Sequence, residues 1–247
     1  MPGSRFLPAG SGGGFSRRDA GGPPGPGRDC LGQDIGPPGR RVITLYQRTD
    51  CPFCWKVRLA LAELSLHYEC VDIRLGERHP VVQELSPSGT VPVMSENGIV
   101  VWESGVMLDY LDRRYGPGRL IPTAAAEEVR VRSLHTYSDR LLGACLFKLV
   151  KEKRSRPAAE WDQDVIRQAQ RDWRVCQQWL DARIAGREFF GPQFGAADCA
   201  LAARVGVAAA YGAGVEREFT NLYRWFEAVR RRPAWEAAYP TGFASSK

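Results

Sequence analysis

The sequence predicts a mixed α/β domain followed by an all-helical domain. From residue 42 to residue 115, β-rich runs alternate with helical patterns in the order β-α-β-α-β-β-α, which is typical of a compact α/β unit. Beyond Pro122 the apolar residues recur with helical spacing, and no further β-rich run is evident. A chain of 247 residues has room for two such domains.

The α/β half begins with a β-rich run, followed by a helix that starts at a proline. A strand–helix–strand order at this point implies a parallel strand pair with a right-handed crossover. Further along, Glu96-Asn97-Gly98 is a hairpin turn signal, and Gly116-Pro117-Gly118 ends the last helix. The expected elements are strands at 42–46, 66–73, 90–94 and 99–101 and helices at 52–65, 81–85 and 103–115.

The second half is expected to be helical throughout. Residues 196–211 are nearly all apolar, which is typical of a buried central helix. The tryptophans of this half lie at helical spacing, which is more typical of core residues than of ligand platforms. The expected helices cover residues 123–153, 162–184, 196–211 and 219–230.

Residues 1–40 are crowded with Gly, Pro, Ser and Arg. Such a segment cannot bury enough apolar surface to offset the entropy lost on ordering. We therefore expect a disordered tail at 1–40, an α/β domain at 41–121 and an all-helical domain at 122–247.

The composition limits which partners and which cellular location we expect. The formal charge of +6 comes from residues spread along helices, so no nucleic-acid partner is expected. No apolar run approaches 18 residues, so no membrane span is expected. The odd number of cysteines, seven, cannot all pair within the chain, and a reducing cytoplasm is the expected location.

The most informative motif is Cys51-Pro52-Phe53-Cys54, which lies between the first strand and the first helix. Pro52 suits the first helical position because its missing N–H would be unpaired there, and this makes Cys51 the N-cap. The sulfur of Cys51 then faces free backbone N–H groups and the positive end of the helix dipole, which stabilise a thiolate. We therefore expect Cys51 to be the nucleophile.

Other interpretations of this motif are weaker. A zinc site needs two further ligands, yet the remaining cysteines stand alone and the three histidines are scattered. We expect no metal. Cys54 lies one turn into the helix, where it either packs in the core or acts as a second, resolving thiol.

Four stretches resemble the cytosolic glutathione transferase family, and the resemblance covers about residues 42–240. The stretches are the Cys-Pro-Phe that opens the first helix, Val91-Pro92-Val93, Trp102-Glu103-Ser104 and Phe194-Gly195-Ala196-Ala197-Asp198. The resemblance implies a thioredoxin-like N-terminal domain followed by the all-helical C-terminal domain of that family. The family usually has Ser or Thr where Gly195 stands, and Asp198 is expected to reach back to the start of its helix.

At the position of Cys51, other members of the family carry Tyr or Ser. A cysteine at this position is typical of the omega, lambda and related bacterial cysteine classes. The resemblance therefore implies glutathione as co-substrate and a mixed disulfide between Cys51 and glutathione. In the family, the backbone of the residue matching Val91 pairs with glutathione, and the helix start matching Ser104 binds its γ-glutamyl carboxylate. For Glu103 and Ser104, simple helix capping is the alternative. The residues expected to bind glutathione are Phe53, Arg78, Val91, Pro92, Glu103 and Ser104.

The function expected from the cysteine classes is that of a glutathione-dependent thiol transferase or reductase. Its second substrate would be a small-molecule or glutathionylated acceptor, bound between the domains near Tyr137, Leu141 and Phe147. The family also implies a homodimer. The alternative is a non-catalytic protein of the stringent starvation protein A type, which keeps this fold and binds RNA polymerase. That relative typically lacks the catalytic cysteine, so Cys51 counts against it.

Overall fold

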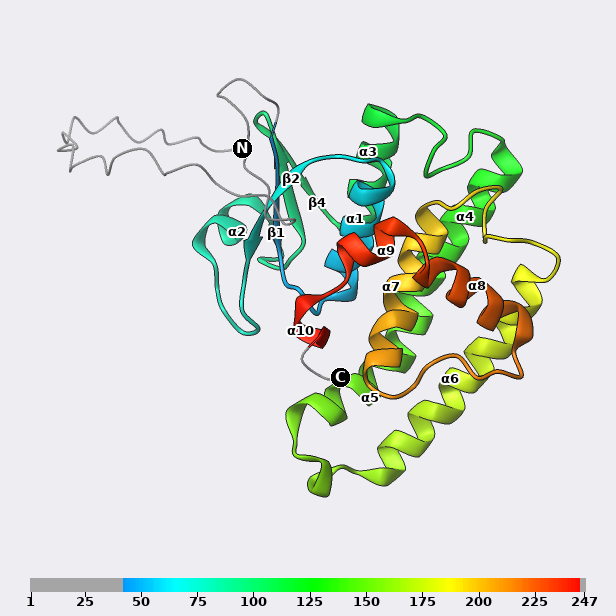
Figure 1. The fold of residues 1–247 in the computed structure, drawn as a ribbon. Coiled ribbons are helices and arrows are strands. Elements are labelled where there is room, and N and C mark those ends of the chain that lie inside the picture. The colour runs from blue at the N-terminus through cyan, green and yellow to red at the C-terminus, as the bar shows by residue number, and fades with distance from the viewer. Residues whose placement is uncertain (1–41, 245–247) are drawn as a thin grey trace, which may run out of the picture.

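The computed structural model describes residues 42–244, which form a four-stranded sheet with three helices and an adjoining helical bundle (Figure 1). The strand order is β2-β1-β3-β4. β1 (Ile43–Gln47) pairs parallel with β2 (Tyr68–Asp72) and antiparallel with β3 (Val93–Glu96), which pairs antiparallel with β4 (Ile99–Trp102). The expected parallel first pair and the expected hairpin are thus confirmed.

Helices cover both faces of this sheet (Figure 1). α1 (Pro52–Glu63) and α3 (Ser104–Tyr115) pack together on one face, and α2 (Pro80–Leu85) lies on the other. A small apolar cluster of Ile73, Val82 and Val93 joins α2 to the sheet. Because both faces are covered, central strand residues such as Leu45 are fully buried.

Two strands, β3 and β2, begin later in the chain than expected. In β3 a backbone donor is missing, and in β2 the first expected residues are unpaired. β3 begins at Val93 instead of residue 90, because Pro92 has no N–H to donate to the ladder. The Val91–Pro92 peptide bond is cis. β2 begins at Tyr68, opposite Ile43, so only five of the eight residues expected in this strand are paired.

Beyond residue 122 the described chain contains helices and no strand. The helices are α4 (Ala125–Tyr137), the π-helical η1 (Ser138–Leu142), α5 (Gly143–Ser155), the 3₁₀ turn η2 (Ala158–Glu160), α6 (Gln163–Ile184), α7 (Ala196–Ala210), α8 (Thr220–Arg230), α9 (Pro233–Ala238) and α10 (Thr241–Ala244). None of these helices is long and apolar enough to cross a membrane. The expected tail at 1–40 lies outside the described residues, and the domain boundary at 121 stays a prediction.

The single helix expected at 123–153 is interrupted by η1. Two contacts with α7 accompany this change of helix type. The buried Ser138 hydroxyl donates to the Ala200 carbonyl at 2.9 Å, and a Cβ on Gly143 would lie 2.9 Å from the Arg204 guanidinium. Both contacts involve residues about 60 positions away, so local periodicity could not predict them.

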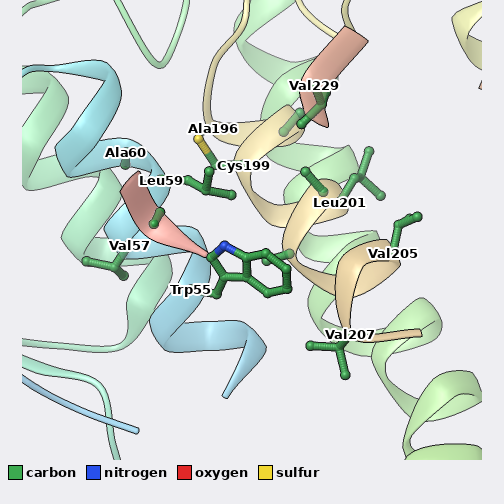
Figure 2. Close-up of a cluster of buried hydrophobic side chains, with 14 of the residues drawn as sticks. Trp55, Val57, Leu59, Ala60, Ala196, Cys199, Leu201, Val205, Val207 and Val229 are labelled. Atoms are coloured by element: carbon green, nitrogen blue, oxygen red, sulfur yellow. The ribbon is translucent and has the colours of Figure 1, made fainter. Parts of the chain in front are cut away.

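α7 is the buried central helix, as its composition predicted. It packs against α1, where the Trp55 indole lies between the two helices (Figure 2). A Cβ on Gly206 would lie 2.5 Å from the Trp55 ring and 2.7 Å from the Trp235 ring. Glycine at this position therefore permits the close approach of α1, α7 and α9.

Asp198 fixes the start of α7, and its expected reach back to the helix start is confirmed. Its fully buried carboxylate accepts from the Gly195 N–H at 3.2 Å, the Phe190 N–H at 3.0 Å and the Trp225 indole N–H at 2.9 Å. The structure also explains the glycine at 195, because a Cβ there would collide with the Leu120 carbonyl oxygen.

Candidate functional site

Cys51 lies at the N-terminus of α1, between β1 and the helical bundle. It is the N-cap residue, with extended backbone angles, and Pro52 is the first helical residue, as the sequence indicated. The Cys51 side chain is only 6 % exposed. Cys54, one turn further along α1, is completely buried, and its sulfur accepts from the Arg48 backbone N–H at 3.4 Å.

The surroundings of Cys51 favour its thiolate. A hydrogen bond from the Cys54 thiol, assisted by the backbone N–H groups of Cys54 and Phe53 and by the charge of Arg48, lowers the pKa of Cys51 from 9.0 to about 6, against the opposing effect of burial. Burial, together with this hydrogen bond to Cys51, raises the pKa of Cys54 well above its ordinary value. The two sulfurs therefore differ in acidity: the surroundings favour the thiolate at Cys51 and the protonated thiol at Cys54.

Two cavities meet at Cys51, and Arg48 also lines both. The first, about 190 Å³, lies between the loop after β2, α2 and the segment before β3. The residues that line it are Arg48, Cys51, Ile73, Arg74, Gly76, Glu77, His79, Val82, Gly89, Thr90 and Val91.

The second cavity, about 230 Å³, lies between α1 and the helices α5 and α7. Phe53 forms part of its wall, and the Arg204 guanidinium lies 4.2 Å from the centre of the Phe53 ring. The other residues that line this cavity are Arg48, Asp50, Cys51, Pro52, Leu146, Phe147, Val150, Arg154 and Val207. A substrate in this cavity would contact both halves of the chain.

The structure brings only some of the proposed site residues to these cavities. Val91 lines the first cavity and Phe53 the second. Pro92 is buried beside Val91, and Ser104 is buried at the start of α3. Glu103 and Arg78 are exposed and line neither cavity, so their roles stay predictions.

Glu103 nevertheless has an unusual backbone. Its φ angle is +67°, in the left-handed region that non-glycine residues rarely adopt. This conformation precedes Ser104, the first residue of α3, and no side chain caps that helix start. The free N–H groups of α3 are thus available to an anion.

For the acceptor, the structure corrects part of the expectation. Phe147 lines the second cavity, as expected. Tyr137 instead stacks on Trp179, with ring centres 4.5 Å apart, and lines a different cavity between α4 and α6. Leu141 is 65 % exposed and lines neither cavity at Cys51. For Leu141 the reason is η1, which changes the helical register from residue 138 onward.

Several polar and charged residues at the site were not expected from the sequence. Arg48 adds a cation beside Cys51, and its position three residues before the motif was the available signal. His79 lines the first cavity, and its buried Nδ1 has no hydrogen-bond partner among the described residues. Arg204 comes from α7, far away in the sequence, and only the fold brings it to Phe53. The described residues contain no cluster of three or more metal-ligating side chains.

Two family models match the chain, one for each half. The model for the glutathione S-transferase N-terminal domain matches residues 45–119, and the model for the glutathione S-transferase C-terminal domain matches residues 147–233. The two matches follow one another in the order of the family's own domains. The chain belongs to the glutathione S-transferase family.

Two relatives of known sequence are described as different kinds of protein, one as a glutathione S-transferase and the other as a stringent starvation protein A homologue. Glutathione S-transferase GstB of Escherichia coli K12 is 27 % identical over 202 residues, covering 78 % of this chain and 95 % of GstB. A stringent starvation protein A homologue from Haemophilus influenzae is 34 % identical over only 76 residues, covering 31 % of this chain and 36 % of the homologue.

Solved structures of the glutathione S-transferase family share this fold. A theta-class glutathione S-transferase from Xanthomonas axonopodis pv. citri, solved with glutathione bound, matches with a TM-score of 0.72 and 24 % identity. The match covers 82 % of this chain and 99 % of the Xanthomonas chain. The thioredoxin-like domain and the helical domain expected from the sequence are therefore confirmed.

Proposed function

We propose that this glutathione S-transferase family member is a glutathione-dependent thiol transferase with Cys51 as its nucleophile. The observation that carries the proposal is the position of Cys51, an N-cap thiol with a pKa lowered to about 6, at the junction of two cavities. A thiolate at neutral pH is the reactive species in thiol–disulfide exchange.

Glutathione would occupy the first cavity. The main chain of Val91 would pair with the glutathione backbone like an added strand, and the free N–H groups at the start of α3 would bind a carboxylate. The carboxylate next to Glu103 and Ser104 would be that of the γ-glutamyl group. The theta-class structure, which has the same fold and bound glutathione, supports this choice of ligand.

The second cavity would hold the acceptor. Its walls combine the apolar Leu146, Phe147 and Val150 with the guanidinium groups of Arg154 and Arg204. Such a mixture suits an acceptor with an apolar body and an anionic group. The acceptor sulfur would then lie next to Cys51, which lines both cavities.

The reaction proceeds by two exchanges at Cys51. The Cys51 thiolate attacks the glutathione sulfur of a glutathionylated acceptor, and the acceptor sulfur leaves as a thiolate and takes up a proton. A second glutathione, as thiolate, then attacks the glutathione sulfur of the mixed disulfide. This step forms oxidised glutathione and returns Cys51 to its thiolate form.

We assign the second exchange to glutathione and not to Cys54. The Cys54 side chain has no exposed surface, and burial and its hydrogen bond to Cys51 hold its pKa well above the ordinary value. A resolving thiol has to ionise, which this environment opposes. Cys54 instead serves as the hydrogen-bond donor that stabilises the Cys51 thiolate.

A binding protein of the stringent starvation protein A type is the second candidate. The 34 % identity to the Haemophilus influenzae homologue over 76 residues supports it. Under that alternative the chain would bind RNA polymerase and would not turn over glutathione. Retention on immobilised glutathione, followed by specific elution with free glutathione, distinguishes the two, because only the transferase needs that ligand. We also propose, from the family alone, a cytoplasmic homodimer.

The direct test is the mass of the intact protein after incubation with oxidised glutathione. We expect one glutathione adduct that maps to the peptide containing Cys51 and is removed by reduced glutathione. A Cys51→Ser variant should lack that adduct while retaining its fold by circular dichroism. An unmodified Cys51 in the wild-type protein would reject the proposal.

A further inference from the structure

A second pair of cysteines lies in the helical domain, on elements that do not carry Cys51. Cys145 belongs to α5 and Cys176 to α6, and these two helices pack against each other. The Cys145 sulfur lies 3.9 Å from the Ala169 carbonyl oxygen of α6, so its side chain points across the helix interface. Both thiols are free and half-buried.

A phenol completes the cluster. The Tyr137 hydroxyl and the Cys145 sulfur both lie close enough to the Cys176 sulfur to affect its pKa. The Tyr137 ring is held by stacking on Trp179, one helical turn beyond Cys176. One sulfur on α6 thus has a polar neighbour from α4 and another from α5.

This arrangement makes the two thiols unequal. The hydrogen bond from Cys145, with help from Tyr137, lowers the pKa of Cys176 to about 6, against burial and the charge of Asp172. The hydrogen bond to Cys176 and burial raise the pKa of Cys145. Cys176 is therefore the thiol that reacts first, and Cys145 is the partner that follows.

We propose that Cys145 and Cys176 form a second redox centre, a dithiol that a small disulfide such as oxidised glutathione converts into a disulfide bond between α5 and α6. The Cys176 thiolate attacks one sulfur of oxidised glutathione, and one glutathione leaves as a thiolate. The Cys145 sulfur, on losing its proton, then attacks the Cys176 sulfur of the mixed disulfide. A second glutathione leaves, so the two protein thiols are oxidised and two glutathione molecules are produced.

The position of this cysteine pair links it to the second cavity, the proposed acceptor site. Leu146, which follows Cys145 directly, lines that cavity, as do Phe147 and Val150 on the same helix. A disulfide at Cys145 would tie this wall of the cavity to α6. Because η1 precedes α5, α5 does not continue α4 in a regular α-helical register while both thiols are reduced.

The test uses a Cys51→Ser variant, so that chemistry at the proposed active site does not contribute. After incubation with oxidised glutathione, we expect an intact mass lowered by two hydrogens. After alkylation of the remaining thiols and digestion, we expect a linked peptide pair containing Cys145 and Cys176. Adding Cys145→Ser should stop the reaction at one glutathione on Cys176. Adding Cys176→Ser instead should leave Cys145 unmodified.

A conservative variant separates chemistry from packing. Tyr137→Phe keeps the ring on Trp179 and removes only the hydroxyl, so we expect slower oxidation to the same disulfide. Absence of the linked peptides in Cys51→Ser, or independent glutathione adducts on both cysteines, would overturn the proposal. Neither outcome depends on whether Cys51 reacts, so this test and that of the proposed function can fail separately.

Discussion

The Lys56 ammonium of α1 lies 2.6 Å from the Asp139 carboxylate of η1, and so connects the thioredoxin-like domain to the helical domain. Lys56 is 1 % exposed, and its Nζ also lies 2.6 Å from Nε2 of His135. Burial and the charge of Lys56 lower the pKa of His135 to about 4, so this histidine is neutral at pH 7 and can accept from the ammonium. Lys56 lies two residues after Cys54 on α1, so the pair fixes the helix that begins at Cys51 against the helical domain.

Asp139→Asn should destabilise the protein. The change leaves the buried Lys56 ammonium without its counter-ion, and breaking a buried pair costs about 3–5 kcal/mol. Since Asp139 is partly exposed, we expect a smaller loss, about 2–3 kcal/mol in the free energy of unfolding. Urea denaturation measures it. Asp164→Asn, which removes the exposed pair with Arg167 on α6, is the control and should change stability by less than about 0.5 kcal/mol.

Cys54 should matter as a donor and not as a second nucleophile. Cys54→Ser keeps a hydroxyl near Cys51, so much of the thiol transferase activity should remain, whereas Cys51→Ser should abolish it. Cys54→Ala removes the donor, and loss of a hydrogen bond to a charged group costs about 1.5–3 kcal/mol, which should raise the pKa of Cys51 by about 1–2. Steady-state reduction of a glutathionylated peptide measures these activities. Equal loss in Cys51→Ser and Cys54→Ser would reject the monothiol route.

Gly206→Ala should weaken the packing of α1 on α7. The added methyl group would lie 2.5 Å from the Trp55 ring, and both Trp55 and Trp235 are buried and cannot move aside freely. Overpacking of this kind costs about 1–3 kcal/mol. Thermal or urea unfolding measures the change, with Ala210→Ser at the exposed end of α7 as the control. A Gly206→Ala protein as stable as the wild type would show that the two tryptophans can rearrange.

Local sequence signals were sufficient for the order of the elements from β1 to α3 and for the N-cap position of Cys51. Pro52 at the first helical position placed Cys51 at the N-cap, and the spacing from Gly195 to Asp198 predicted the capping of α7. Signals of this kind act within four residues, so a sequence shows them directly.

Some site residues were not indicated by the sequence. Their positions depend on contacts between segments that are far apart along the chain. Arg204 reaches Phe53 only because α7 packs on α1, and the contacts of Ser138 with α7 accompany a change of register that helical periodicity does not reveal. Leu141 was expected at the second cavity for the same reason, since the helix was extended past residue 137 without interruption. The short helices α9 and α10 were also missed, because six and four residues are too few for a periodic pattern.

The central claim, a Cys51 thiolate stabilised by its surroundings, is tested most directly by the pH dependence of Cys51 alkylation by iodoacetamide. A Cys176→Ser background excludes the second reactive thiol, and peptide mapping assigns the product. Because only the thiolate reacts, a lowered pKa moves the rise in rate to lower pH, and we predict a midpoint near pH 6 with about 90 % of the maximal rate at pH 7. A midpoint near the ordinary thiol value of 9.0 would contradict the account.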